Sequence, residues 1–323
     1  MISIKSVSVR YGDLLALDSL DLELGRGEVF GYIGPNGAGK STTMKVLACL
    51  LRADEGEAHV DGLSVRSRPG DIRKVVGYMP DFLGVYDDLT VHEYLQFFCA
   101  AFSVPRKKRA SLIDGVLELT DLNEKKHTMV SGLSRGMQQR LGVARVLVHD
   151  PKVLLLDEPA SGLDPRARIE MRSLLMELQR MGKTIMVSSH ILSELHEMCS
   201  SIGIIERGKL LFAGTTDEAI AKAGVGERIT IRLESDAARA PAVLQGDERI
   251  LSAAPPPAPD RDEADGAGAP ASNEVVVELA PGGHAHHFVI ERLVNAGLRI
   301  EAFTPESVKL EDVFLRLTKG QVQ

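Results

Sequence analysis

The stretch Gly34-Pro35-Asn36-Gly37-Ala38-Gly39-Lys40-Ser41, followed by Thr42, decides the fold of this chain. An apolar run from Glu28 to Ile33 leads into it, as a buried strand would. Apolar residues at helical spacing come after it: Met44, Leu47, Ala48 and Leu51. Strand, glycine loop and helix in this order surround a phosphate with backbone N–H groups and a helix N-terminus. The pattern predicts a nucleotide site in which the Lys40 ammonium binds the β- and γ-phosphates and the Ser41 hydroxyl binds Mg²⁺.

Two carboxylates stand at the end of the run Leu154-Leu155-Leu156-Asp157-Glu158. The run predicts a buried strand, which brings both side chains to the edge of a sheet. There Asp157 would hold Mg²⁺ through water, and Glu158 would polarise the water that attacks the nucleotide. The alternative is a plain turn at the strand end, closed by Pro159. The phosphate loop upstream favours the catalytic interpretation.

Strand and helix patterns alternate over the first two thirds of the chain. Val7 and Val9 belong to a short alternating strand, so we predict two strands before the phosphate loop. A helix on the spacing of Met171 to Met181 separates buried strands at Val153 to Leu156 and Thr184 to Ser188. This alternation predicts an α/β fold whose parallel sheet is covered on both faces.

Two further regions flank this pattern. Thr90 and Glu93 form a capping box that opens a helical section reaching about Leu147. Beyond Gly214, two alternating segments and an amphipathic helix from Leu310 predict a small α+β domain. A loop at about 253–273 is rich in Pro and Ala and is expected to be disordered. We therefore predict an ATPase domain at 1–220 and an accessory domain at 221–323.

Composition excludes several classes of protein. Lys and Arg number 38 against 45 Asp and Glu, a formal charge of -7, which argues against a dedicated nucleic-acid binder. The three cysteines lie far apart in the chain and are expected to be small buried residues: Cys49, Cys99 and Cys199. The first residues lack the pattern of a signal peptide, and no apolar run approaches the ~20 residues of a membrane span. Any membrane role is expected to come through a partner.

The segment Leu133-Ser134-Arg135-Gly136-Met137-Gln138-Gln139-Arg140 resembles the signature motif of the ABC transporter ATPase family. The order of the other motifs is similar too. Tyr11 lies where the family has an adenine-stacking aromatic, and Ser161-Gly162-Leu163-Asp164 resembles its D-loop. His190 corresponds to its switch histidine. Tyr11 as a surface aromatic and His190 as a strand-end polar residue are the plain alternatives. The resemblance spans about Met1 to Gly214.

The resemblance implies a P-loop fold with an antiparallel subdomain near the N-terminus and a helical subdomain around the signature. It implies a dimer with ATP at its interface, in which Ser134 and Gly136 of one subunit close the γ-phosphate bound by the loop of the other. The dimer would be a homodimer or a heterodimer with a second ABC ATPase. Its reaction would be ATP hydrolysis coupled to transport through an integral-membrane permease. The chain would then be cytoplasmic, held at the inner face of the cell membrane only through that permease.

The chain departs from the family pattern at two positions. Asp81, in Tyr78-Met79-Pro80-Asp81, stands where the family's Q-loop has a Gln, and a carboxylate there could still reach Mg²⁺ through water. Arg135 stands in the signature where glycine is commonest. Ser134 and Gly136, the expected γ-phosphate contacts, are retained.

Two short segments indicate the direction of transport. The stretch from Val85 to Leu95 and the ending from Leu310 to Leu317 resemble ATPases of ABC-2 type exporters. The alternative is an ABC-type ATPase acting on ribosomes or DNA, but such proteins carry two cassettes, a long coiled coil or zinc insertions, none of which stands here. A regulator that binds ATP without hydrolysis is a third possibility. The presence of Lys40, Asp157, Glu158 and His190 argues against it.

Overall fold

The structure, a computed structural model, describes residues 1–82, 84, 86–189, 195, 198–224, 226–255, 273–280, 285–306 and 310–318. It divides into two compact units: Met1–Thr216 together with Thr318, and Asp217–Leu317. This division falls four residues before the predicted boundary at 220. The assignment of an ATPase domain and an accessory domain to the two units stays a prediction.

A six-stranded sheet in the order β10-β9-β3-β8-β7-β6 forms the centre of the first unit. Its strands are β3 (Val29–Ile33), β6 (Val76–Met79), β7 (Val153–Asp157), β8 (Thr184–Ser189), β9 (Ser201–Glu206) and β10 (Lys209–Thr215). All neighbours are parallel except β10, which runs antiparallel to β9. Every residue of β3, β7 and β8 is buried, because other elements cover both faces. The predicted α/β fold with a covered parallel sheet is confirmed.

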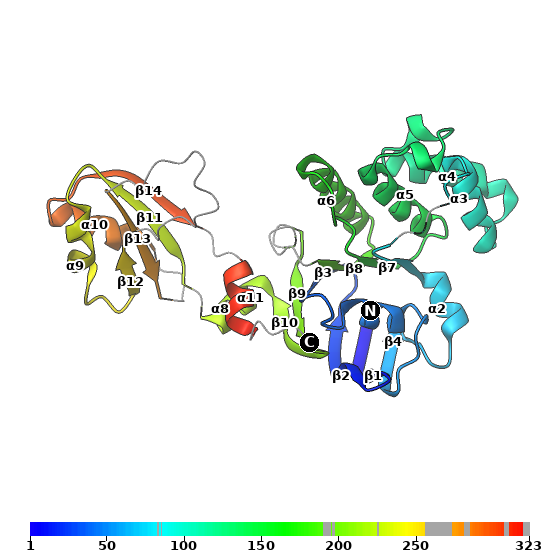
Figure 1. Cartoon of the computed structure of the whole chain (residues 1–323), viewed down its shortest axis with the longest axis horizontal. Helices are drawn as coiled ribbons and strands as arrows, with labels where there is room; N and C mark the ends of the chain where they lie inside the picture. Colours follow the sequence, from blue (N-terminus) through cyan, green and yellow to red (C-terminus); the bar gives the residue numbers. More distant parts are fainter. Residues whose placement is uncertain are drawn as a thin grey trace. The chain divides into compact units, whose positions relative to one another are not determined.

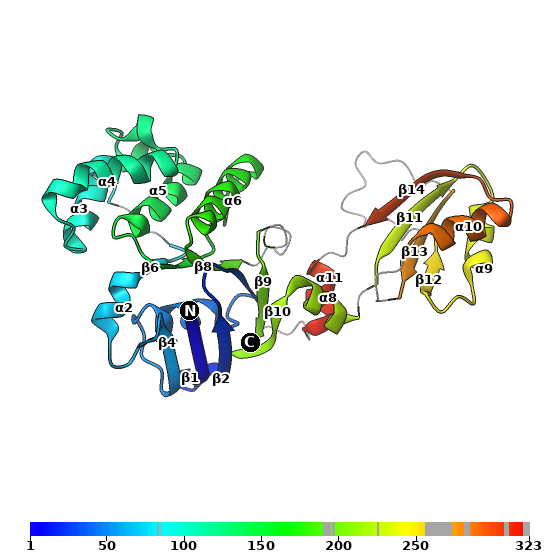
Figure 2. The same cartoon turned by 180° about the vertical axis from the view of Figure 1, so that it is seen from behind.

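Helices cover this sheet and form a separate group beside it. They are α1 (Lys40–Leu47), α2 (Pro69–Val75), α3 (Val91–Ala101), α4 (Arg106–Leu119), α5 (Arg135–Leu147) and α6 (Pro165–Arg180). The capping box at the start of α3 is present, with the Glu93 N–H donating to the Thr90 hydroxyl over 3.3 Å. Figures 1 and 2 show α3, α4 and α5 together on the side of the sheet opposite β1, β2 and β4. The predicted helical section is confirmed.

An antiparallel sheet in the order β2-β1-β4-β5 packs on the other side. Its strands are β1 (Ile2–Tyr11), β2 (Leu14–Leu24), β4 (Glu55–Val60) and β5 (Leu63–Ser64). Three strands thus precede the phosphate loop, and the prediction of two was wrong because it missed β2. The pairing of β1 with β2 shifts register at three places, and Ser19 has a φ of 50°. These irregularities interrupt the alternation of apolar and polar residues from which a strand is predicted.

The second unit has a four-stranded antiparallel sheet in the order β12-β13-β11-β14. Its strands are β11 (Arg228–Leu233), β12 (Ile250–Ala254), β13 (Glu274–Leu279) and β14 (Ile300–Glu306), and its helices are α8 (Thr216–Ala223), α9 (Ala240–Leu244), α10 (His287–Asn295) and α11 (Leu310–Leu317). Helix α9 joins β11 to β12 and α10 joins β13 to β14, which is the βαββαβ arrangement of ferredoxin-like folds. Buried side chains of α9 and α10 pack on the inward residues of β11 and β13.

Some details differ from the sequence-based expectations. Ala253 and Ala254, placed at the start of the disordered loop, belong to β12, where they pair with Val277 and Val276. Residues 256–272 of that loop lie outside the described residues. Cys99 and Cys199 are buried as predicted, whereas Cys49 is only half-buried. In the described part of the chain, no helix combines the length and the apolar character that crossing a membrane requires.

Candidate functional site

The phosphate loop joins β3 to α1, and two of its glycines are required by close neighbours. A Cβ atom on Gly34 would lie 2.4 Å from the Ile205 carbonyl oxygen of β9. A Cβ atom on Gly39, whose φ is +113°, would lie 2.8 Å from the Ala16 carbonyl oxygen of β2. Any side chain at these positions would push the loop away from the strands beneath it. The loop therefore keeps its backbone N–H groups where a phosphate can approach them.

Lys40, the first residue of α1, is buried in the loop. Its ammonium donates to the carbonyl oxygens of Gly34 at 2.6 Å and of Pro35 at 3.3 Å. It also lies 3.5 Å from the Glu158 Oε1, and the two side chains are only 6% and 11% exposed. A buried cation needs such partners to offset the cost of desolvation. Phosphate oxygens would replace the loop carbonyls with negatively charged acceptors, which bind an ammonium more strongly.

The two carboxylates lie at the carboxyl end of β7. Ser188 stands opposite Asp157 in the neighbouring strand β8. Its hydroxyl donates to the Asp157 Oδ1 at 2.7 Å and accepts from the Glu158 N–H at 3.0 Å. Glu158 has a φ of 52°, a backbone conformation that few residues other than glycine adopt. The strand therefore ends abruptly at Glu158, whose carboxylate reaches Lys40 while Asp157 is held by β8.

The residues predicted to hold Mg²⁺ come from three elements. Ser41 is in the first turn of α1, Asp157 ends β7, and Asp81 follows β6, which pairs with β7. Within the described residues, no group of three or more His, Cys, Asp or Glu side chains forms a dedicated metal site. Mg²⁺ ordinarily takes one or two carboxylates together with phosphates and water. A hydroxyl and two carboxylates therefore fit an ion that binds with its nucleotide.

Tyr78 on β6 is a neighbour of this site that sequence reasoning did not single out. Burial, and then the negative charges of Asp157 and Asp81, raise the pKa of its phenol well above the ordinary value. Its hydroxyl is buried and makes no hydrogen bond to any other described residue. Both carboxylates therefore lie close enough to Tyr78 for their charges to act on its phenol.

Asp81→Gln is expected to keep ATP hydrolysis within about tenfold of the parent, a barrier change of about 1.4 kcal/mol. The reason is that the Asp81 side chain is exposed, whereas Asp157 is buried and bound to Ser188. Steady-state ATPase rates over a range of Mg²⁺ concentrations measure the effect, with the exposed Asp87→Asn as a control. A drop of a hundredfold at saturating Mg²⁺ would instead make Asp81 an essential ligand.

Other predicted site residues lie away from this cluster. Tyr11 is the last residue of β1 and is 46% exposed, so part of its side chain is accessible to a ligand. Ser134 caps α5, where its hydroxyl accepts from the Met137 N–H at 3.3 Å. Gly136 lies against Ala167 of α6 rather than on the phosphate loop. His190 follows β8 directly and lies outside the described residues.

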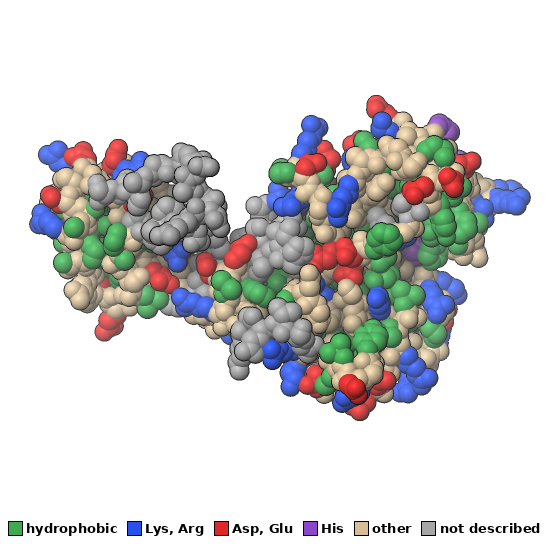
Figure 3. Space-filling model, in the orientation of Figure 1, with side chains coloured by type: hydrophobic (Ala, Val, Ile, Leu, Met, Phe, Trp, Pro, Cys, Tyr) green, Lys and Arg blue, Asp and Glu red, His purple; other side chains and the backbone are tan. Residues whose placement is uncertain are grey.

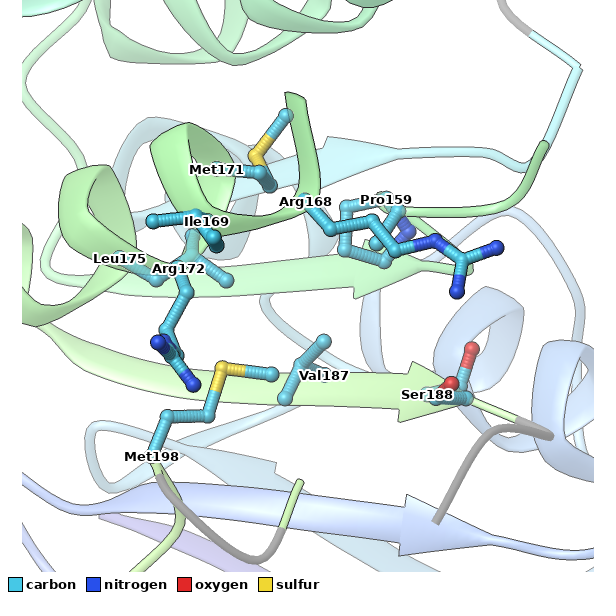
Figure 4. Close-up of a pocket in the computed structure, with 11 residues that line it drawn as sticks. Pro159, Arg168, Ile169, Met171, Arg172, Leu175, Val187, Ser188 and Met198 are labelled. Carbon is cyan, nitrogen blue, oxygen red and sulfur yellow. The ribbon is translucent and has the colours of Figure 1, made fainter. Parts of the chain in front are cut away.

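A small cavity lies behind the Glu158 segment, between α6 and the end of β8. Figure 4 shows Pro159, Arg168 and Val187 on its walls. Its volume is about 70 Å³. Sites for small organic ligands are typically about 300–1,000 Å³, so this cavity is far too small for a nucleotide. The nucleotide site is the surface of the phosphate loop instead.

A phosphate loop at the edge of a parallel sheet, with a buried lysine beside two strand-end carboxylates, defines a P-loop nucleotide hydrolase. A family model described as ABC transporter matches residues 17–161. The Nod factor export ATP-binding protein I of Burkholderia orbicola is 40% identical over 213 residues, covering 66% of this chain and 70% of that protein. The probable multidrug ABC transporter ATP-binding protein YbhF of Escherichia coli is 36% identical over 228 residues, covering 71% and 39%.

Solved structures agree with these relatives. An ATP-binding subunit of an ABC transporter superposes with a TM-score of 0.63 at 27% identity, covering 69% of this chain and 92% of that one. The cbiO1 protein of Clostridium perfringens, part of the ABC transporter complex cbiONQ, gives 0.63 at 29% identity, covering 68% and 90%. The chain belongs to the ABC transporter ATP-binding proteins. Its reaction is the hydrolysis of ATP.

Proposed function

We propose that this chain supplies the energy of ATP hydrolysis to a separate integral-membrane permease in an ABC-2 type exporter. The observation that carries the proposal is the likeness, over about two thirds of the chain, to proteins named for Nod factor export and for multidrug transport. Residues 86–95 and α11 are two segments that resemble ATPases of ABC-2 exporters. Val85, which opens the first of them, lies outside the described residues.

The described side chains support the following division of work. The loop backbone and Lys40 bind the β- and γ-phosphates. Ser41 and Asp157, with help from Asp81, would hold Mg²⁺, which would supply positive charge beside the phosphates. Glu158 orients the attacking water and accepts its proton. The hydroxyl of Ser188 keeps Asp157 in place and also binds the Glu158 backbone.

The proposed working state is a dimer with ATP between its subunits, either a homodimer or a heterodimer with a second ABC ATPase. Ser134 is exposed at the start of α5. The N-terminus of this helix favours a negative charge, which suits the γ-phosphate bound by the other subunit. The chain would lie in the cytoplasm, on the inner face of the membrane, through its permease alone. Figure 3 shows Lys and Arg side chains spread among Asp and Glu on one face, which supports the expectation that nucleic acid is not the partner.

Purification from gently solubilised membranes tests the proposal. We expect a protein with several membrane-spanning helices to copurify with the tagged chain, and its removal to release the chain from the membrane fraction. The gene next to this one is expected to encode about six such helices. Copurification of ribosomes or DNA, with no membrane protein, would instead support a role outside transport.

A further inference from the structure

The side chain of Arg135, the first residue of α5, lies flat against Gly162 in the turn before α6. A Cβ atom on Gly162 would lie 2.3 Å from the Cζ, 2.4 Å from the Nη2 and 2.5 Å from the Nη1 of Arg135. Three guanidinium atoms at nearly equal distances place the plane of the group over the glycine. No side chain fits at residue 162 while Arg135 keeps this position. The unusual Arg in the signature and the glycine in this turn thus form a matched pair.

This contact stands at the end of a longer interface between α5 and α6. At the next residue of α5, a Cβ atom on Gly136 would lie 3.1 Å from the Ala167 Cβ. The Arg140 Nη1 lies 3.8 Å from the Glu170 Oε2. Arg135 extends this row of contacts beyond the N-terminus of α6, onto the preceding turn.

Backbone hydrogen bonds link this turn to Glu158. The Leu163 N–H donates to the Ala160 carbonyl at 3.3 Å, and the Ser161 N–H donates to the Glu158 carbonyl at 3.1 Å. Gly162 has a φ of +68°, as the third residue of a glycine-requiring turn does. A shift of this turn would therefore move the backbone carbonyl of Glu158, which already has a strained φ.

We propose that Arg135 is a positioning residue that holds the turn at residues 160–163 against α5 and so fixes the backbone of Glu158. The contact is within one subunit and needs no nucleotide. It rests on the proposed function in one respect: in the ATP-bridged dimer, the start of α5 meets the nucleotide of the other subunit. Arg135 would then connect the two nucleotide sites. Ser134 beside it would contact the γ-phosphate of one site, and the turn that Arg135 holds would fix Glu158 of the other.

A double-mutant cycle on the full-length chain tests the contact, with Arg135→Ala, Gly162→Ala and both together. Each single change is expected to lower kcat by about fivefold with an unchanged Kd for ATP. The double mutant is expected to lose clearly less than the product of the two single effects, because without Arg135 the clash at residue 162 disappears and only the strain of its positive φ remains. Backbone amides of residues 158–164 should exchange hydrogen faster in Arg135→Ala, a readout that needs no hydrolysis. Arg135→Lys should not rescue, because an ammonium has no flat face to lay on the glycine.

Gly182→Ala is the matched control. Gly182 also has a positive φ, +83°, but a Cβ atom there would meet nothing within 4 Å. Its effect should add fully to that of Arg135→Ala, whereas the effect of Gly162→Ala should add only in part, since the clash with Arg135 is then absent. Additive effects of Arg135→Ala and Gly162→Ala, unchanged hydrogen exchange, or full rescue by Lys would each overturn the proposal. If the unmutated chain hydrolysed no ATP, the catalytic assignment would be wrong. The hydrogen-exchange comparison would still test the role of Arg135.

Discussion

Replacing Glu158 with Gln is expected to lower ATP hydrolysis by about two to four orders of magnitude while ATP still binds. The amide keeps the size of the carboxylate but cannot accept the proton of the attacking water. The backbone N–H that donates to Ser188 is unaffected, so Asp157 and the strand end should keep their positions. Lys40 loses a carboxylate 3.5 Å away, which leaves its charge more available to the phosphates. ATP affinity should therefore be equal or higher, and calorimetry together with single-turnover hydrolysis measures both quantities.

The same variant tests the ATP-bridged dimer. When hydrolysis is blocked, bound ATP stabilises the closed dimer increasingly as its concentration rises above Kd. Gel filtration with and without Mg-ATP, repeated with the permease present, should show the dimer for Glu158→Gln. Glu177→Gln, an exposed substitution on α6, should behave as the parent. Hydrolysis by Glu158→Gln at the parental rate would show that Glu158 is not the catalytic base. A monomer under all conditions would contradict the ATP-bridged dimer.

The central fold could be predicted because its strands are buried on both faces. β3 and β7 are unbroken runs of buried residues, and the glycines after β3 restrict what can follow. β2 could not be predicted in the same way, since its leucines are interrupted at Ser19, where the pairing with β1 changes register. The βαββαβ order of the second unit could not be predicted from the sequence either. Its short helix α9 has only five residues, too few for a periodic pattern.

The residues of the candidate site also differ in whether the sequence alone can predict their roles. Lys40, Asp157 and Glu158 stand in local motifs, so their types and spacing indicate their chemistry. The role of Ser188 follows only from the register of β7 and β8, which places it opposite Asp157, 31 residues away along the chain. The contact of Arg135 with Gly162 likewise depends on how α5 packs on α6. Interactions between distant segments need the fold first, because no sequence period connects them.

Lys40→Ala is expected to abolish ATP binding at ordinary concentrations, raising Kd by about a hundredfold or more through the loss of charge-assisted contacts. No cation near Lys40 in the loop sequence can replace its ammonium. The change also removes a cation 3.5 Å from Glu158, in a place where both side chains are nearly buried. The free energy of unfolding without ATP should fall by up to about 3 kcal/mol. Lys45→Ala, on the exposed face of α1, should change neither quantity.

The double variant Lys40→Ala with Glu158→Gln separates these two effects. Removing the negative charge from the buried site should restore most of the lost stability, because the carboxylate left without Lys40 is what destabilises the single variant. ATP binding should not return, since the amide offers no positive charge to the phosphates. Thermal unfolding reports the first quantity and calorimetric titration with Mg-ATP the second. Parental ATP affinity in Lys40→Ala would remove Lys40 from the phosphate site, and recovery of binding in the double variant would show that repulsion by Glu158, rather than the absent ammonium, had prevented it.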